Sequence, residues 1–329
     1  MRASIIIPAH NAQRTLARCV GACLSQEYPD FEVIVVDDGS TDATASIARE
    51  IAGITRIQQE NQGPAAARNR GAGAATGEIL VFTDADCVPE PGWLARLLSA
   101  FDDGVAGVGG TYTCANPERR LARVIQAEIA RRHAQFGDRV DFLGSFNVAY
   151  RAENFRNVGG FDESYRQASG EDNDLAYRVE ASGGLLRFTS EAAVAHYHPD
   201  RLWRYLRTQA RHGYWRIKLY RDHPARARGD QYAGLPDLIA PPLALLGAAL
   251  APALAAAQAL GWNGIRLLPA LASVWTVTAL LHAPLIRQMR GALAPADLLY
   301  FGLVLLLRDV ARAAGLCRGF WDFQVRGGS

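Results

Sequence analysis

The sequence is poor in cysteine and contains no paired thiols. Its five cysteines are scattered over 329 residues without any C-x-x-C pair: Cys19, Cys23, Cys87, Cys114 and Cys317. An odd number without motif spacing argues against a disulfide framework and indicates a reducing compartment. The same scatter predicts no thiolate metal site, and the spacing of Cys19 and Cys23 suits small core residues on one helix.

A segment typical of export is also lacking. Arg2 is followed by a strand-length apolar run, Ile5–Ile7, and then by Pro8. The apolar part of a signal peptide is longer than this, so we expect no signal peptide here.

Acidic residues become scarce after residue 200. Residues 201–329 hold 16 basic and 6 acidic residues, whereas residues 1–200 hold 19 basic and 27 acidic residues. Such a split indicates two regions with different surroundings. The acidic first region argues against nucleic acid as a partner.

Short apolar runs alternate with segments of helical spacing in the first 200 residues. The predicted strands lie at 4–8, 31–36, 55–58, 79–82, 105–112, 142–150 and 192–197, and the main helices at 11–25, 63–75, 90–101, 118–135 and 175–181. This alternation predicts parallel βαβ units and a doubly wound, Rossmann-like α/β sheet.

Two acids follow the predicted strand at 79–82. Asp84 and Asp86 flank Ala85, and polar residues also end the first two strands, at His10 and at Asp38. Open α/β sheets bind ligands at the carboxyl edge of their strands. Paired carboxylates there suit a hard divalent cation that keeps room for phosphate oxygens, although a solvated turn would show the same triplet.

A basic, aromatic-rich stretch opens the second region. Residues 201–228 carry nine basic residues and one acid, Asp222, interleaved with Trp and Tyr. We interpret residues 201–232 as a basic amphipathic helix and linker beside anionic headgroups.

Two long uncharged segments follow in the expected membrane region, residues 233–329. Segments at about 238–261 and 267–286 are each long enough to cross a hydrocarbon core, with Trp262 and Asn263 between them. The alternative is a soluble helical subdomain rich in Ala and Leu. A third apolar segment, at about 296–316, predicts an interfacial or re-entrant helix, and the flanking arginines predict that both ends of the hairpin are cytoplasmic.

Several of these runs together resemble the inverting glycosyltransferases of family 2, which have the GT-A fold. The matching runs are S-I-I-I-P-A-H-N (4–11), V-I-V-V-D-D-G-S-T-D (33–42), N-Q-G-P-A-A-A-R-N-R-G (61–71), G-E through D-A-D (77–86), G-G-F-D (159–162) and G-E-D (170–172). The resemblance covers about residues 1–200. The Q-x-x-R-W motif of processive members is absent, since Gln209 and Arg211 only approach it, and this favours transfer of a single sugar.

The resemblance implies a UDP- or GDP-sugar donor and a Mg²⁺ or Mn²⁺ ion. On the donor side it implies Pro8, Ala9, Asp38, Arg68, Asp84, Ala85 and Asp86. Asp84 and Asp86 would hold the metal, with His196 or His198 as a further ligand or phosphate contact. Each role has an ordinary alternative: Asp38 as a helix cap, Arg68 as an exposed helical residue, and the histidines as structural residues.

By the same resemblance Asp172 is the general base that takes the proton of the acceptor hydroxyl. Glu171 would hold the acceptor or raise the pKa of Asp172 by repulsion. An acidic helix N-terminus is the alternative reading of this pair. Gly144, Ser145 and Asn147 are expected to shape the acceptor side.

These features predict a metal-dependent, inverting hexosyltransferase in the bacterial inner membrane, with its catalytic domain in the cytoplasm. Its acceptor would be a lipid-linked or membrane-adjacent glycan in the synthesis of cell-surface polysaccharide or glycolipid. Two alternatives stay open: a polyprenyl-phosphate sugar synthase, whose phosphate acceptor needs little help from a base, and a catalytically degenerate membrane scaffold.

Overall fold

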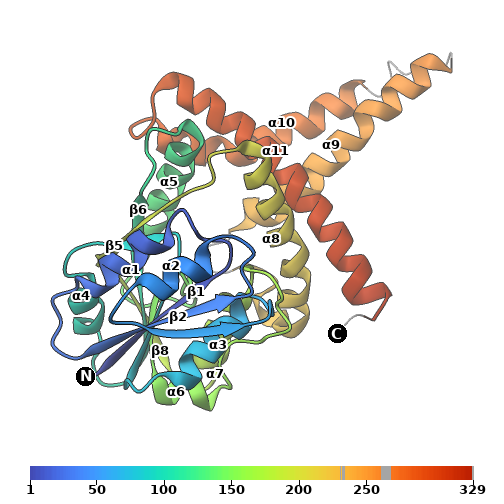
Figure 1. The fold of residues 1–329 in the computed structure, drawn as a ribbon. Helices are drawn as coiled ribbons and strands as arrows, with labels where there is room; N and C mark the ends of the chain where they lie inside the picture. Colours follow the sequence, from blue (N-terminus) through green and yellow to red (C-terminus); the bar gives the residue numbers. More distant parts are fainter. Residues whose placement is uncertain (230, 232–233, 261–267, 328–329) are drawn as a thin grey trace. The chain divides into compact units, whose positions relative to one another are not determined.

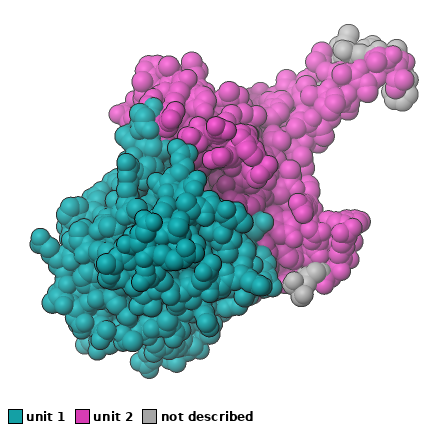
Figure 2. Space-filling view, in the orientation of Figure 1, with its two compact units in different colours: residues 1–118, 129–198 teal, residues 119–128, 199–329 magenta. Residues whose placement is uncertain are grey.

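The computed structural model describes residues 1–229, 231, 234–260 and 268–327 (Figure 1). The chain divides into two compact units (Figure 2). Unit 1 comprises residues 1–118 and 129–198, and unit 2 comprises residues 119–128 and 199–329.

Unit 1 is built on one mixed sheet of eight strands, in the order β3-β2-β1-β4-β7-β6-β8-β5. The first four strands along the chain run parallel, and β7 pairs antiparallel with both β4 and β6. The strands are β1 (Ala3–Ala9), β2 (Phe31–Asp38), β3 (Thr55–Gln59), β4 (Ile79–Thr83), β5 (Cys87–Pro89), β6 (Val105–Cys114), β7 (Asn147–Arg151) and β8 (Leu185–His196). The predicted α/β sheet is therefore confirmed.

Helices cover both faces of this sheet. They are α1 (Leu16–Leu24), α2 (Thr44–Glu50), α3 (Pro64–Ala74), α4 (Trp93–Ser99), α6 (Ala152–Asn157) and α7 (Glu171–Ala181), while α5 (Arg120–His133) spans the boundary of the units in sequence. Successive residues of a strand point to opposite faces. Accordingly Ile5 and Ile7 pack with α1 and α4, whereas Ile6 packs with α3 and α7. Full burial of each such side chain contributes about 1.5–3 kcal/mol.

The observed bounds differ from the predicted ones at several elements. Helix α7 begins at Glu171 rather than at residue 175, and α4 is shorter than the predicted 90–101. The first helix begins at Leu16 rather than at residue 11, because Asn11 has φ 53° and the chain turns there. Residues 142–146 are not a strand, and β7 starts only at Asn147. The last strand starts at Leu185, earlier than predicted, because it pairs with most of β6.

Unit 2 is helical. Its helices are α8 (Leu202–Asp222), a 3-10 turn (Pro224–Arg226), α9 (Leu235–Ala259), α10 (Leu268–Met289), α11 (Pro295–Phe320) and a π-helical turn (Trp321–Val325). Helices α8 and α11 cross at backbone contact: a Cβ on Gly213, Gly315 or Gly319 would meet a carbonyl oxygen of the other helix. Small residues at these positions therefore set the close approach of α8 and α11.

Two helices of unit 2 are long and apolar enough to cross a membrane. The segments Pro236–Ala257 and Leu268–Met289 each have 22 residues, with mean hydropathies of 1.9 and 1.4. Only 22% and 11% of the most apolar stretches of these helices are buried, whereas a soluble core helix is mostly buried. The predicted turn at Trp262 and Asn263 lies outside the described residues.

Candidate active site

The carboxyl ends of β1, β2 and β4 carry the polar residues expected at the ligand-binding edge. The register aligns Ala9 with Asp37, so the ends of β1 and β2 lie side by side. After β4 the chain turns tightly, and the amide of Cys87 donates to the carbonyl of Asp84 at 2.9 Å. This turn places Asp84, Ala85 and Asp86 between β4 and the short strand β5.

Asp38 is committed to the loop that precedes α3. Its carboxylate accepts hydrogen bonds from the amides of Gln62 and Gly63, at 2.8 and 2.9 Å, and from the side chain of Gln59 at 2.8 Å. Asp38 is 3% exposed and does not cap α2, because at the start of that helix it is Asp42 that accepts from the amide of Thr44. Asp38 thus shapes the predicted donor side chiefly through the backbone of this loop, beside Pro8 and Ala9 of β1.

Arg68 joins two acids that are far apart in the sequence. Its guanidinium donates to Asp84 Oδ1 at 2.7 Å and to Glu171 Oε1 at 2.9 Å. The side chain is fully buried, so it is not the exposed helical arginine of the ordinary alternative. Although burial disfavours its charge, Asp84 and Glu171 raise the pKa of Arg68 above its usual value. One cation therefore ties the end of β4 to the start of α7.

Helix α7 begins at Glu171, four residues before the predicted start at 175, and its first two acids have different surroundings. Glu171 is 2% exposed, and its second oxygen accepts from the amide of Ser169 at 2.7 Å. Burial, together with the negative charge of Asp172, raises the pKa of Glu171 to about 7.

Asp172 is only half-buried and accepts from the amides of Asn173 and Ser145. Burial raises the pKa of Asp172 above its ordinary value despite these hydrogen bonds. Of the two acids, Asp172 is the one that is partly exposed to solvent.

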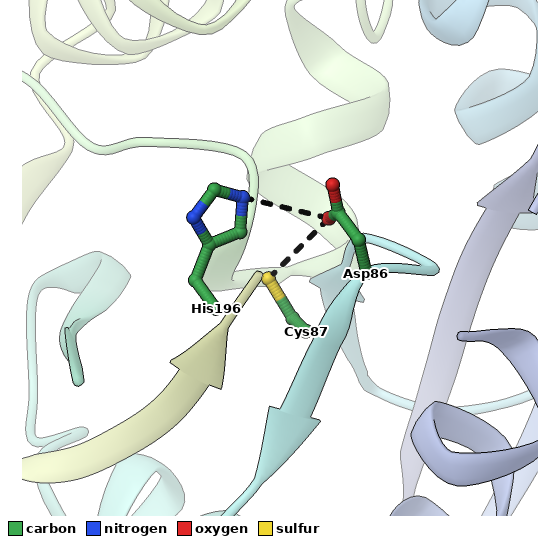
Figure 3. Close-up of side chains that lie close together, drawn as sticks. All are labelled: Asp86, Cys87 and His196. Atoms are coloured by element: carbon green, nitrogen blue, oxygen red, sulfur yellow. Dashed lines mark hydrogen bonds and ion pairs between the residues drawn. The ribbon is translucent and has the colours of Figure 1, made fainter. Parts of the chain in front are cut away.

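The predicted metal ligands are only partly brought together. His196 Nε2 lies 3.6 Å from Asp86 Oδ1 (Figure 3). His198 Nδ1 lies 3.1 Å from His196 Nδ1. Asp84, by contrast, is turned to Arg68. Burial and the neighbouring His196 lower the pKa of His198 to about 3, so His198 is neutral. It contacts Nδ1 of His196, whose Nε2 faces Asp86.

Cys87 stands beside these groups and was not singled out in the sequence. Its sulfur lies 3.9 Å from Asp86 Oδ1, and its backbone pairs directly with that of His196 across β5 and β8 (Figure 3). Cysteine spacing could not predict this position of Cys87, because its neighbours come from the preceding turn and from a strand more than a hundred residues later.

The residues expected on the acceptor side differ in what they contact. The amide of Ser145 reaches Asp172, and Gly144 leaves space for the ring of Phe146. Asn147 instead donates to the carbonyls of Thr111 and Ala192 and accepts from the indole of Trp93. Asn147 is 1% exposed and its side-chain amide is hydrogen-bonded to other parts of the protein, so it is not available to contact an acceptor.

A separate cavity of about 360 Å³ lies at the other ends of the strands. It is lined by Asp102, Asp103, Val105, Arg139, Leu185, Leu186 and Arg187. Val105 and Leu185 are the first residues of β6 and β8, so this cavity is away from the carboxyl edge. None of the described residues that line this cavity is a predicted site residue.

Comparison with known families and proteins gives consistent matches. Residues 4–159 match the model of glycosyl transferase family 2, and residues 131–199 match that of the N-terminal domain of galactosyltransferase. The pre-mycofactocin glycosyltransferase of Mycobacterium tuberculosis is 32% identical over 240 residues, covering 67% of this chain and 48% of that protein. The validoxylamine A glucosyltransferase of Streptomyces hygroscopicus is 33% identical over 217 residues, covering 55% and 51%. The chain thus spans about half the length of these curated relatives.

Among solved structures, a mannosyltransferase from Pyrobaculum calidifontis, in complex with GDP-Man and Mn²⁺, is similar over 98% of this chain and 87% of its own. The TM-score is 0.60 and the identity 22%. This likeness shows the fold, and the predicted GT-A fold is confirmed.

Proposed function

Because residues 4–159 belong to glycosyl transferase family 2, we propose that the chain transfers one sugar, with inversion, from a UDP- or GDP-sugar to a lipid-linked or membrane-adjacent acceptor. The observation that carries the proposal is the contact of Arg68 with both Asp84 and Glu171. It ties the predicted donor side at the end of β4 to the helix that presents Asp172.

The donor would be held at the edge formed by β1, β2 and β4. The loop ordered by Asp38 offers backbone groups to the nucleoside, next to Pro8 and Ala9. Asp86 offers an oxygen suited to Mg²⁺ or Mn²⁺, and His196 Nε2, 3.6 Å from that oxygen, offers a further ligand or a contact to phosphate. When bound, such an ion neutralises charge on the departing diphosphate.

Asp172 would act as the general base. Its carboxylate is held by two amides, the residue is partly exposed, and its raised pKa favours proton uptake from an acceptor hydroxyl. Attack by that hydroxyl on the face opposite the diphosphate would invert the anomeric carbon. Ser145 lies against Asp172 and would border the acceptor, while Glu171, held by Arg68, fixes the start of α7.

The exposed apolar helices α9 and α10 support a membrane anchor. We propose that they form a hairpin in the bacterial inner membrane with both ends in the cytoplasm, because Arg287 and Arg290 follow the apolar part of α10 and the basic helix α8 precedes α9. A membrane location would bring a lipid-linked acceptor to the enzyme, and α8 and α11 would lie at the headgroups.

The test uses the full-length protein in detergent with a panel of UDP- and GDP-sugars and Mn²⁺, and measures release of the nucleoside diphosphate. With the donor identified, Asp172→Asn should lower the rate of transfer to a hydroxyl acceptor about 10²–10⁴-fold, as expected for loss of a general base, with nucleotide affinity unchanged. Glu180→Gln, at an exposed position of the same helix, is the matched control.

Each other outcome selects an alternative. An Asp172→Asn variant that keeps most of its rate with a polyprenyl phosphate acceptor would indicate a polyprenyl-phosphate sugar synthase. Failure of the wild-type protein to bind any nucleotide in the presence of Mn²⁺ would indicate a scaffold. A product of retained anomeric configuration, read from its NMR coupling constants, would reject inversion.

A further inference from the structure

Three different donor atoms converge at the start of β5. The sulfur of Cys87 and the imidazole of His196 both point to the carboxylate of Asp86, and all three donor atoms lie within 4.8 Å of one another (Figure 3). The separations from Asp86 Oδ1 are 3.6 Å to His196 Nε2 and 3.9 Å to the sulfur.

This spacing is close to that of a tetrahedral metal site. Zinc binds oxygen and nitrogen at about 2.0–2.2 Å and sulfur at about 2.3 Å, so its ligands stand about 3.3–3.6 Å apart. The separation of 3.6 Å lies at the upper end of this range, the separation of 3.9 Å exceeds it by 0.3 Å, and the sulfur and the imidazole nitrogen lie within 4.8 Å of each other. Small rotations of the side chains would bring all three atoms onto one ion.

The backbone explains why these groups meet. Cys87 and His196 are directly paired residues of the antiparallel strands β5 and β8, so their side chains point to the same face of the sheet. Asp86 lies in the turn just before β5, where its side chain is free to reach back over Cys87.

The donor set differs from that of a site made for Mg²⁺ or Mn²⁺ alone. Those ions prefer oxygen ligands and six-fold coordination, whereas thiolate and imidazole favour zinc and similar borderline-soft ions. We propose that Asp86, Cys87 and His196 form a thiolate-containing zinc site that competes with the catalytic cation for Asp86 and His196 and stops sugar transfer when occupied.

The geometry accounts for the inhibition. A tetrahedral zinc ion with three protein ligands has one open position, too few for two oxygens of a diphosphate. A six-coordinate ion held by Asp86 and His196 keeps several open positions. Zinc binding releases the proton of the Cys87 thiol to solvent and needs no oxidant. The zinc site itself follows from the residues, while the claim that it inhibits rests on the proposed function.

The binding test uses Co²⁺, a spectroscopic substitute for zinc, added to the full-length protein in detergent. We expect a near-ultraviolet thiolate-to-cobalt charge-transfer band in the wild-type protein, its loss in Cys87→Ser, and its retention in Cys317→Ser, which removes an exposed thiol of unit 2. X-ray absorption of the zinc-loaded wild type should show one sulfur at about 2.3 Å, a result that depends on no variant.

Affinity and inhibition are measured next. Zinc affinity is measured by competition with a chromogenic chelator. Loss of an outer-shell partner lowers metal affinity about 10–100-fold, and we expect Cys87→Ser, which removes a direct ligand, to lower it by more than this. The zinc concentration that halves Mn²⁺-supported release of nucleoside diphosphate should rise by a similar factor, with each variant compared with its own zinc-free rate.

The outcomes separate the two proposals. A wild-type protein without the cobalt band, or a Cys87→Ser variant that keeps it, overturns the zinc site. A zinc-loaded spectrum with only oxygen and nitrogen neighbours overturns it as well. If the band and its loss are observed but no sugar nucleotide is turned over, the zinc site stands and the proposed transferase function fails.

Discussion

Replacing Glu171 by Gln should change how the stability of unit 1 depends on pH. Glu171 is 2% exposed, and burial together with Asp172 raises its pKa from 4.5 to about 7. Arg68 opposes this rise and lowers the pKa of Glu171, but its guanidinium is shared between Glu171 and Asp84. The folded state therefore keeps a proton on Glu171 that the unfolded chain releases at lower pH.

The sign and size follow from this difference. Since the folded pKa lies above the unfolded value, the stabilising contribution of Glu171 is complete below pH 4.5 and is lost as the pH rises through 7. The interval between 4.5 and about 7, at about 1.4 kcal/mol per pH unit, corresponds to about 3 kcal/mol. Glutamine does not titrate, so relative to wild type the variant should gain about this much free energy of unfolding between pH 4.5 and 8.

A second effect of the substitution does not depend on pH. Glu171 accepts from Arg68 with one oxygen and from the amide of Ser169 with the other, so the amide group of Gln must face one of these donors. The lost hydrogen bond costs about 1–3 kcal/mol at every pH. It shifts the whole curve of the variant and leaves its slope unchanged.

The buried thiols of unit 1 provide the assay. Cys19, Cys23 and Cys87 are fully buried, so a short maleimide pulse after equilibration in urea labels them only in unfolded unit 1. Mass spectrometry of their peptides then gives the free energy of unfolding at each pH for both proteins. A difference between variant and wild type that stays constant from pH 4.5 to 8 would refute the account of Glu171.

Two further predictions concern buried contacts in the two units. Arg68→Met should destabilise unit 1 by about 3–5 kcal/mol in the same thiol assay, because it removes the cationic partner of the buried Glu171. Arg70→Met, at an exposed position of the same helix, should stay within about 0.5 kcal/mol. Equal effects of the two would contradict the ion-pair argument. Gly315→Ala should lower the stability of unit 2 by about 1–3 kcal/mol in thermal unfolding in detergent, because its methyl group meets the carbonyl of α8. Gly302→Ala in the same helix has room for the methyl group and should not destabilise, and a loss as large as that of Gly315→Ala would reject the packing explanation.

The sequence by itself determined the elements and much of the edge they form. Short apolar runs located β1, β2 and β4, and the acids that follow β4 could be assigned to the carboxyl edge without coordinates. Glu171 and Asp172 could also be assigned to the neighbourhood of a helix N-terminus, because an acidic first turn is a local feature, although α7 begins four residues before the predicted start at 175. Such features depend on neighbours a few residues apart, which a single sequence shows directly.

Only the tertiary structure decided which of these side chains meet. Arg68 contacts Glu171 across 103 residues of sequence, and Cys87 faces His196 because β5 pairs with β8 at the far edge of the sheet. Likewise, the hydrogen bonds of Asn147 with β6 and β8 make its side chain unavailable to an acceptor. The physical reason is that strand order and register are set by the packing of the whole sheet. Residue spacing along the chain therefore cannot show which donors converge on one ion.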